Sequence, residues 1–394
     1  MTNIDSTKSS IMKNLRWPKH WQENVQQISA WELARSLSFP GRKNEDWKWI
    51  NFDHIDLDEL TVEKPVITIL SSDNQDINAS VLKADSKENL LIQPETDTYS
   101  ALNAALSEEL CYIHIPAKIQ KLDPVHVIIT LNAHSSAANT RAIIQLDKGA
   151  QAKVVFELQS DTHEHLQAFL NFQLEIQLDE GARLELMEVQ NLGEHVSYVS
   201  REYAHVHRDA HLNWTYVALG SRVAKSFITV DLLGPGSETL MNGAYFSGSG
   251  QVIDIDTQQN HLTAQAHSDL LYKGAAIGSG KAIWEGMIYV DHVAQQTDSY
   301  QSNRNLLLDD RAEIKTIPGL EINANDVSCS HGATVGRLND DELFYSQSRG
   351  IPMREAEKLI VEGFFAEVLA KSNDEALSKK LLEQISEKFD RNHA

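Results

Sequence analysis

Two neighbouring stretches decide the fold: TRAIIQLDKGAQAKVVFELQ at residues 140–159 and AFLNFQLEIQLDEGARLELMEVQN at residues 168–191. Each contains two segments of alternating apolar residues, joined by a short turn with Asp and Gly, which predicts strand, turn and strand. The turn phrase is repeated, because Gly149 and Gly181 occupy the same place in phrases 32 residues apart. A period of about 30 residues without long helices between the strands indicates a β-solenoid.

Weaker copies of the turn phrase extend this pattern along the chain. RDAHLNW at residues 208–214 and LDDRAEIKT at residues 308–316 repeat it, with Ala in place of Gly-Ala. We therefore expect a mainly β protein with a solenoid core over residues 106–345. An antiparallel β-sandwich is the alternative, because hairpin turns with Asp and Gly also occur in that fold.

Helical patterns flank this core. Apolar residues recur at helical spacing within residues 20–38, so residues 1–105 are expected to form a mainly helical N-terminal domain. Residues 346–394 are expected to form a C-terminal helical domain, with one helix that begins near Pro352 and another after the capping residues 372–374.

The first C-terminal helix carries more apolar surface than one core contact needs. Val361, Phe365 and Leu369 form a second apolar stripe beside the stripe that would face the core. This second stripe predicts contact with a partner.

The charge balance excludes several classes of partner. The 394 residues carry 35 basic and 56 acidic side chains, a formal net charge of −21 at pH 7. A surface this acidic repels phosphate backbones and anionic lipids, so neither nucleic acid nor a membrane is an expected partner. The N-terminus lacks the continuous apolar segment of a secretory signal, and no stretch reaches about 18 apolar residues. We expect a cytoplasmic protein.

The cysteine count limits the metal chemistry of the chain. Cys111 and Cys329 are the two cysteines, and neither belongs to a CxxC pair. A disulfide framework, a zinc ribbon and a four-cysteine iron–sulfur site within one chain are therefore excluded.

GAAIGSGKA at residues 274–282 resembles a phosphate-binding loop. However, Gly274 and Gly280 enclose five residues, where that motif has four, and Ala282 stands where magnesium needs a hydroxyl. We interpret the segment as a solenoid turn, so this chain is not expected to hydrolyse ATP itself.

Three histidines, His205, His207 and His211, lie within seven residues. On a strand His205 and His207 would share a face, as in some metal sites, but no carboxylate follows at the spacing such a site needs. Solvent-facing histidines are the favoured interpretation, and a stand-alone metal-binding protein is an alternative.

Asp254 and Asp256 alternate in VIDIDT, and Asp269 follows. Clustered aspartates on stacked strands can cleave acidic polysaccharides, so a β-helix carbohydrate-active enzyme is a second alternative. Aspartates exposed on an acidic surface are the favoured interpretation.

Cys329 and His331 lie in the segment with the densest combination of motifs, PGLEINANDVSCSHGATVGRLNDDELFYSQSRGI at residues 318–351. Two residues apart on a strand, they would project to one face and could approach one ion, since thiolate and imidazole both suit iron or zinc. Two ligands do not complete a site. The residues alone favour a packed cysteine and a hydrogen-bonded histidine, and a metal would need further donors from elsewhere.

At this segment the chain resembles the SufB/SufD family of iron–sulfur cluster assembly scaffolds. The matching phrases are HSDLLYKGAAIGSGKAIWEGMIYV (267–290), AQQTDSYQSNRNLLLDDRAEIKTIPGLEI (294–322), DVSCSHGATVGRL (326–338) and ELFYSQSRGI (342–351), with a weaker NEDWKWINF near residue 50. Ser-His-Gly at 330–332 is similar to the SufD branch, whereas the SufB branch typically carries Glu-His-Glu there, together with cluster-binding cysteines that this chain lacks.

The resemblance implies a right-handed parallel β-helix between N- and C-terminal helical domains. It also implies a non-enzymatic scaffold subunit of a SufBCD-type complex, which pairs with a SufB-like paralogue and docks a SufC-like ABC ATPase, with two copies of the ATPase in the complex. An exposed solenoid edge would also permit a homodimer.

The resemblance gives roles to the residues singled out above. It implies that His331 faces a cysteine of the SufB-like partner. Cys329 is a weaker candidate, since only its position beside His331 suggests it. Iron or a nascent iron–sulfur cluster would then be shared at that interface, and this chain alone would hold no cofactor stably. It also places the ATPase contact on residues 352–371, which agrees with the stripe of Val361, Phe365 and Leu369.

Overall fold

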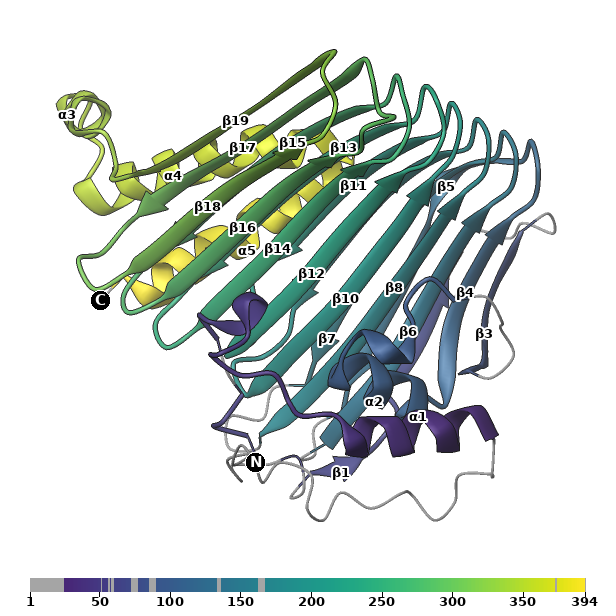
Figure 1. The fold of residues 1–394 in the computed structure, drawn as a ribbon. Coiled ribbons are helices and arrows are strands. Elements are labelled where there is room, and N and C mark those ends of the chain that lie inside the picture. The colour runs from purple at the N-terminus through teal and green to yellow at the C-terminus, as the bar shows by residue number, and fades with distance from the viewer. Residues whose placement is uncertain are drawn as a thin grey trace, which may run out of the picture.

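The computed structural model is a two-sheet β-solenoid with helices against its outer faces (Figure 1). It describes residues 25–50, 52–55, 57, 60–71, 77–84, 90–132, 136–161, 167–372 and 374–393. From β4 onward consecutive strands alternate between the sheets, so each coil adds one strand to each sheet.

The first sheet, sheet A, has ten strands: β3 (Asn78–Lys83), β4 (Glu109–Ile115), β6 (Ser136–Leu146), β8 (Ala168–Leu178), β10 (Val196–Val206), β12 (Val223–Leu232), β14 (Val252–His261), β16 (Lys281–Val290) and β18 (Glu313–Ile322) in spatial order, with β1 (Thr61–Val62) beside β6. Sheet B has nine strands: β2 (Val66–Leu70), β5 (Gln120–Leu131), β7 (Gln151–Ser160), β9 (Arg183–Asn191), β11 (His211–Ala218), β13 (Glu238–Ser247), β15 (His267–Ala276), β17 (Thr297–Leu307) and β19 (Val327–Gly336).

Parallel pairing runs through both sheets from β4 to β19. The antiparallel pairs are β2 with β5 and β3 with β4, at the N-terminal end. A sandwich would need antiparallel neighbours throughout, so the solenoid prediction is confirmed and the sandwich alternative is wrong.

The repeated turn phrase has a conformational cause. Gly149 and Gly181 both adopt positive φ, 68° and 70°, which glycine reaches without steric cost. Each donates its N–H to a carbonyl of the next coil, Gly149 to Glu180 and Gly181 to Arg208, both over 2.9 Å. The phrase therefore marks the place where each coil turns and contacts the next one.

The main core lies between the sheets, in the lumen of the solenoid. Alternate residues of each strand face inward, as Leu212, Trp214, Tyr216 and Ala218 do on β11, and all four are buried. The lumen is filled by side chains for most of its length, so the solenoid is a packed core.

N-terminal helices cover part of the outer face of sheet A. The helical elements are α1 (Val25–Ser36), η2 (Glu45–Trp47), η5 (Pro94–Thr96) and α2 (Thr98–Leu106). The predicted helix at residues 20–38 is thus confirmed as α1 over the described residues. Asn103 of α2 donates to the carbonyls of Thr140 and Asn171, which ties the helix to β6 and β8. The same N-terminal region also supplies β1, β2 and β3.

The C-terminal helical elements are α3 (Asp340–Ser348), α4 (Met353–Leu369), η6 (Ala370–Ser372) and α5 (Glu375–Asn392), and of these α4 and α5 cover the outer face of sheet B. The two predicted C-terminal helices are confirmed as α4, which follows Pro352, and α5, whose first turn is capped by Asp374. Of the helices in the described part of the chain, none is long and apolar enough to cross a membrane.

Candidate functional site

The C-terminal end of the solenoid is open. β18 and β19 are the last strands of sheets A and B, so the outer edge of each has no neighbouring strand among the described residues. The strands are correspondingly exposed, and Ile322 and Val335 are 39% and 40% accessible. Free edges offer unpaired backbone donors and acceptors to another strand. This end is therefore suited to pairing with a second protein.

Cys329 and His331 both lie on β19 at this open end. In the parallel register Cys329 pairs with Ser299 and His331 with Gln301, and both β17 residues are buried in the lumen. Side chains in register on neighbouring strands point to the same side, so Cys329 and His331 face the mouth of the lumen. The prediction that they share a face is confirmed by this register.

The two side chains differ in their readiness to bind a metal. His331 is exposed and Cys329 is half-buried. Burial, followed by the nearby charge of Asp298, raises the pKa of the Cys329 thiol, which disfavours the metal-binding thiolate. Within the residues that the structure describes, no group of three or more His, Cys, Asp and Glu side chains could hold a metal ion. The mouth offers an imidazole and a thiol, and it is not a closed metal site.

The predicted docking stripe on α4 is buried within this chain. Val361, Phe365 and Leu369 are each at most 1% exposed, because α4 packs them against sheet B and α5. Phe365 lies 6.1 Å, ring centroid to ring centroid, from Phe246 on β13. A helix packed between a sheet and a second helix needs apolar residues on both sides, so the second stripe contacts α5 and sheet B and is not a partner surface.

The exposed apolar residues of this region lie elsewhere. Phe344 and Tyr345 of α3 are 73% and 59% exposed, and Leu359 and Met353 of α4 are 54% and 43% exposed. Figure 1 shows α3 projecting beyond the end of the sheets. A run of exposed large apolar side chains indicates a protein contact surface. The sequence motif ELFYSQSRGI contains two of them, but helical periodicity alone does not show which side is covered.

Two of the three clustered histidines contact carboxylates on neighbouring strands, and the three do not converge on one point. His205 Nε2 lies 3.7 Å from Asp231 Oδ2, and His211 Nδ1 lies 2.5 Å from Glu238 Oε2. His207 is exposed just after the end of β10. The solvent-facing interpretation holds for His207, while His205 and His211 are half-buried partners of acids on the next strand.

Asp254 and Asp256 are not surface aspartates. Lys225 Nζ lies 3.0 Å from Asp254 Oδ1 and 2.8 Å from Asp256 Oδ2, and both Lys225 and Asp254 are fully buried. Burial raises the pKa of Asp254 to about 6 and that of Asp256 to about 7, against the opposing effect of Lys225. The expectation of exposed acids is wrong for Asp254 and Asp256, because the N-terminal segment around Trp47 packs over this part of sheet A. Asp269 lies on β15 of sheet B and is half-buried. These acids line no open substrate groove.

The phosphate-loop resemblance also has a structural explanation. Residues 274–276 end β15, and β16 begins at Lys281. Gly278, between the two strands, adopts a positive φ of 62°. The segment is a solenoid turn, as the sequence predicts.

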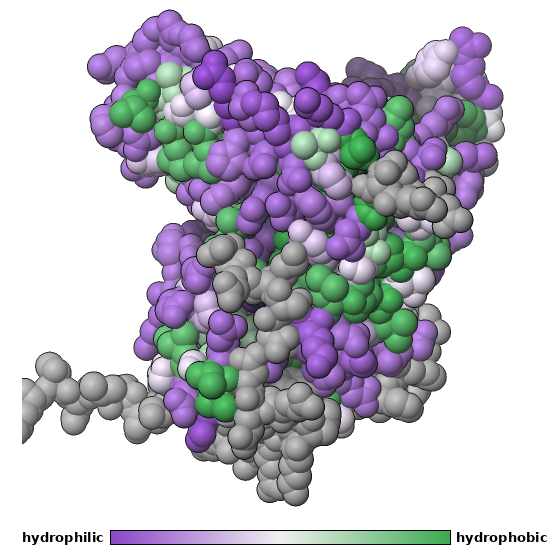
Figure 2. All heavy atoms as spheres, turned by 90° about the vertical axis from the view of Figure 1, so that its right-hand side faces the viewer, coloured by the Kyte–Doolittle hydropathy of each residue, from purple (hydrophilic) through white to green (hydrophobic). Residues whose placement is uncertain are grey.

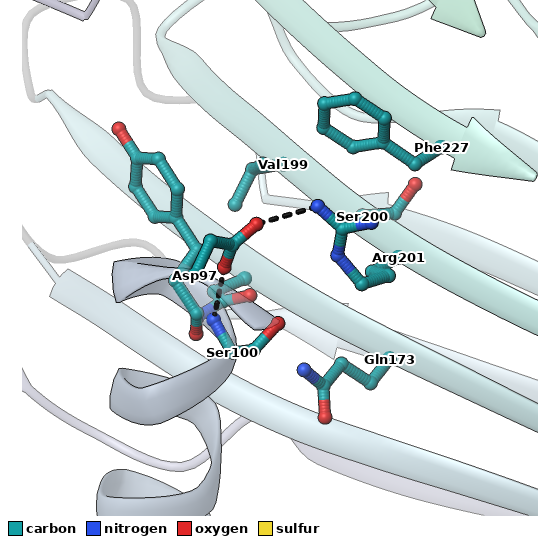
Figure 3. Close-up of a pocket in the computed structure, with 9 residues that line it drawn as sticks. Asp97, Ser100, Gln173, Val199, Ser200, Arg201 and Phe227 are labelled. Atoms are coloured by element: carbon teal, nitrogen blue, oxygen red, sulfur yellow. Dashed lines mark hydrogen bonds and ion pairs between the residues drawn. The ribbon is translucent and has the colours of Figure 1, made fainter. Parts of the chain in front are cut away.

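A small cavity between α2 and sheet A is shown in Figure 3. Arg201 extends toward Asp97, with Nη2 2.5 Å from Oδ2, while Asp97 also accepts from the N–H of Ser100. The guanidinium lies 4.4 Å from the centre of the Phe227 ring. The cavity holds about 10 Å³, the room of one water molecule. This cluster fastens α2 to β10 and is too small for a substrate.

The N-terminal end of the solenoid differs from the open C-terminal end. Figure 2 shows it as a largely hydrophilic surface with separate apolar patches. The antiparallel strands β2 and β3 end the two sheets here, and their exposed apolar side chains are Val66, Leu70 and Val81. No residue from the dense C-terminal motifs lies at this end, so the C-terminal mouth is the candidate site.

The sequence of this chain is similar to those of known proteins. Residues 129–364 match the family model described as the SUF system FeS cluster assembly, SufBD core domain. An iron–sulfur cluster assembly SufBD family protein of Mycobacterium tuberculosis is 28% identical over 284 residues, 70% of either chain. The iron–sulfur cluster assembly protein SufD of Escherichia coli is 26% identical over 401 aligned positions, which cover 93% of this chain and 92% of that protein.

The matched region extends from the first coils through β19 to α4, and it includes the mouth with Cys329 and His331. The chain therefore belongs to the SufB/SufD family of iron–sulfur cluster assembly proteins, and it is SufD-like.

Proposed function

We propose that this chain is a non-catalytic scaffold subunit of a SufBCD-type complex that assembles iron–sulfur clusters. The observation that carries the proposal is the open C-terminal end, where an exposed histidine faces the lumen mouth between two free sheet edges. The family membership supports the assembly role, and the incomplete donor set supports a shared site.

A SufB-like paralogue is the proposed partner at this end. A second solenoid can extend both sheets across the free edges of β18 and β19, because parallel strands in adjacent coils have the same spacing. Its cysteine thiolate would then supply the donor that this chain lacks. Iron or a nascent cluster is the cargo of this interface, held by His331 and the partner thiolate together, with Cys329 as a secondary ligand.

Replacing His331 with alanine is expected to lower the rate of cluster formation in the reconstituted complex at least tenfold, because the shared site loses its imidazole. The rate is measured by the visible absorbance of the forming cluster. His207→Ala is the matched control, since that histidine is exposed but far along the chain from the mouth. A normal rate for His331→Ala would remove the basis of the proposal.

A SufC-like ABC ATPase is the proposed second partner, and ATP hydrolysis is assigned to it. Its docking surface is the exposed apolar face of α3 and α4, which comprises Phe344, Tyr345, Met353 and Leu359. Closure of two ATPase copies would move these helices, and α4 transmits the movement to sheet B through the buried Phe365.

Phe344→Asp is expected to weaken ATPase binding at least tenfold, because a charge replaces a large apolar contact residue. The dissociation constant is measured by calorimetry or by co-purification at graded concentrations. Leu122→Asp on β5 is the control, since Leu122 is 60% exposed and lies outside the proposed surface. Equal loss of binding in both variants, or in neither, would contradict this docking surface.

A carbohydrate-active enzyme is not supported. Asp254 and Asp256 form a cluster with Lys225 on sheet A, whereas Asp269 lies on β15 of sheet B, so the three aspartates do not line one groove. The family match concerns iron–sulfur cluster assembly.

A further inference from the structure

One carboxylate links the C-terminal half of α4 to two strands of sheet B. Glu367 Oε2 accepts a hydrogen bond from Lys273 on β15, and Glu367 Oε1 lies 3.8 Å from Arg304 Nη1 on β17. Lys273 is 3% exposed and also donates to the carbonyl of Phe364 over 2.8 Å. The hydrogen bond from Lys273 holds the pKa of Glu367 below its ordinary value, so this carboxylate is ionised at neutral pH. Glu367 therefore bridges β15 and β17 from outside the sheet.

These contacts differ in kind from the rest of the packing of α4. The helix otherwise rests on sheet B through apolar side chains such as Val361, Phe365 and Val368. Apolar contacts have no preferred direction, so they permit a helix to shift along the surface beneath it. Among the described residues, the ion pairs and side-chain hydrogen bonds between α4 and sheet B all involve Glu367 or Lys273. A shift of α4 therefore acts on the strands most directly at Glu367.

The N-terminal half of α4 has different neighbours. Arg354 and Lys358 form ion pairs with Asp390 of α5, over 3.1 and 2.6 Å. Met353 and Leu359, which belong to the proposed docking surface, lie in this half. The helix thus has an exposed half for docking and a second half that is linked to the sheet.

β17 connects Arg304 to the strand that carries His331. Asn305, the next residue after Arg304, points into the lumen and is buried. Asn305 Nδ2 donates to the carbonyl of Thr334 on β19 over 3.1 Å, while its Oδ1 accepts from the Tyr245 hydroxyl over 2.6 Å. Thr334 follows His331 on β19. A displacement of β17 at Arg304 is therefore passed to the mouth.

We propose that Glu367, through Lys273 and Arg304, couples the ATPase-docking helix to the mouth of the solenoid. When ATPase closure moves α4, Glu367 displaces β15 and β17, and Asn305 passes the displacement to β19. Glu367 and Arg304 are positioning residues, because they lie outside both the proposed docking surface and the mouth. The inference rests on the proposed function, since it assumes ATPase docking on α4 and cluster formation at the mouth.

Four substitutions test the coupling. Glu367→Ala removes both links at a side chain that is 51% exposed, and alanine suits a helix. Arg304→Met removes the link to β17 alone, whereas Arg304→Lys keeps a cation there. Asp390→Asn is the matched control, because it weakens the ion pairs between α4 and α5 and leaves the links to sheet B intact.

The experiment uses the reconstituted complex of this chain with its SufB-like and SufC-like partners. It measures the clusters formed per ATP hydrolysed, the rate of ATP hydrolysis and the dissociation constant of the ATPase. We expect Glu367→Ala and Arg304→Met to lower the clusters formed per ATP about fivefold, an effect in the range of coupling residues. Their hydrolysis rate and dissociation constant should match the wild type. Arg304→Lys and Asp390→Asn should match the wild type in all three measurements.

A combined variant tests whether Glu367 and Arg304 act through one connection. Glu367→Ala already removes the partner of Arg304, so adding Arg304→Met should lower the clusters per ATP no further. Losses that multiply, to roughly 25-fold, would show two separate effects and overturn the inference.

Other outcomes would also overturn the coupling role. Wild-type clusters per ATP in Glu367→Ala or in Arg304→Met would do so, as would an equal loss in Asp390→Asn. Weaker ATPase binding in Glu367→Ala would place Glu367 in the docking surface instead. A lower urea midpoint of the isolated Glu367→Ala chain, together with slower ATP hydrolysis in the complex, would assign this residue a purely structural role.

The wild-type complex distinguishes this inference from the proposed function. If the wild-type chain binds no ATPase or supports no cluster formation, the proposed function is wrong, and the coupling role is overturned with it. If the wild-type chain does both and Glu367→Ala does so equally well, only the coupling role is wrong.

Discussion

Lys225→Met is expected to lower the free energy of unfolding by about 3–5 kcal/mol, the usual cost of removing one partner from a buried ion cluster. Lys225 is the cation between Asp254 and Asp256, and each carboxylate has an oxygen within 3.0 Å of Nζ. The second oxygens, Asp254 Oδ2 and Asp256 Oδ1, are buried without a hydrogen-bond partner among the described residues. Methionine keeps the length of the side chain and removes the charge, so the buried Asp254 and the half-buried Asp256 lose their counter-charge.

The stability lost in Lys225→Met should be smaller at low pH. Burial already raises the pKa of Asp254 and of Asp256 in the folded chain, so both bind protons more tightly there than in the unfolded chain. Without Lys225, the folded chain has a lower free energy with Asp254 and Asp256 protonated than with both ionised. Protonated acids need no counter-charge, so the destabilisation should be smaller at pH 5 than at pH 8. The destabilisation is measured by urea unfolding of wild type and Lys225→Met at both pH values, with circular dichroism as the signal.

Two further variants control this experiment. Lys281→Met removes a lysine that pairs with Glu313 over 2.9 Å at the surface, where the side chain is 47% exposed. Such pairs contribute roughly 1 kcal/mol or less, so this variant should unfold almost like the wild type. Asp254→Asn and Asp256→Asn added to Lys225→Met should recover most of the loss. If they recover nothing, the damage comes from packing and the electrostatic explanation is wrong.

The fold could be predicted because its information is local and repeated. The positive-φ turn at Gly149 recurs at Gly181, and alternation along each strand is visible in any one coil. The same period-two rule correctly placed Cys329 and His331 on one face. Strand direction and pairing then follow from the repeat, because stacked coils bring equivalent residues into register.

The residues whose surroundings were predicted wrongly contact segments that are remote in the sequence. Asp254 is buried because the N-terminal segment around Trp47 crosses sheet A, about 200 residues earlier in the chain, and no local pattern encodes that crossing. Phe365 faces sheet B and α5 together, whereas a helical wheel shows only that two sides are apolar. The bridge that Gln301 on β17 forms across the lumen was also not predicted, because the carbonyls of Gly286 and Gly319 that accept from its Nε2 belong to the opposite sheet. Inward-facing polar residues at alternate positions, 299, 301, 303 and 305, were the available signal.

The lumen contains a second arrangement with a large expected effect. Glu188 on β9 and Glu202 on β10 are completely buried and lie within hydrogen-bonding reach of each other. Glu202 Oε1 accepts from the Ser200 hydroxyl over 2.6 Å. In the described part of the chain, no donor reaches Glu202 Oε2 or either Glu188 oxygen with good geometry. Two ionised carboxylates would only repel each other there, so at least one must carry a proton that it donates to the other.

The sign of the pH dependence follows from this shared proton. Burial, and then the charge of Glu202, raises the pKa of Glu188, and burial raises the pKa of Glu202 to about 7. The folded chain therefore retains protons that the unfolded chain releases above its ordinary carboxyl pKa. Stability attributable to the pair is greatest in acid and falls as the pH rises from about 5 through 7. Ionising the pair should cost several kilocalories per mole, the order expected for a buried carboxylate without a counter-charge.

Glu188→Gln combined with Glu202→Gln is expected to remove this loss, since amides of the same shape do not titrate. Urea midpoints are measured for wild type and variant at pH 5, 6, 7 and 8. The difference between the urea midpoints of the two proteins isolates the effect of the pair, because the other buried groups titrate in both proteins. Lys388 is one such group: burial lowers its pKa to about 7, so its contribution to stability rises with pH, opposite to that of the pair. Glu185→Gln, at a surface pair with Lys153, should keep the wild-type slope. If the double variant also keeps that slope, the two lumen acids are ionised in the folded chain, and the solenoid interior must stabilise their charges by some other group.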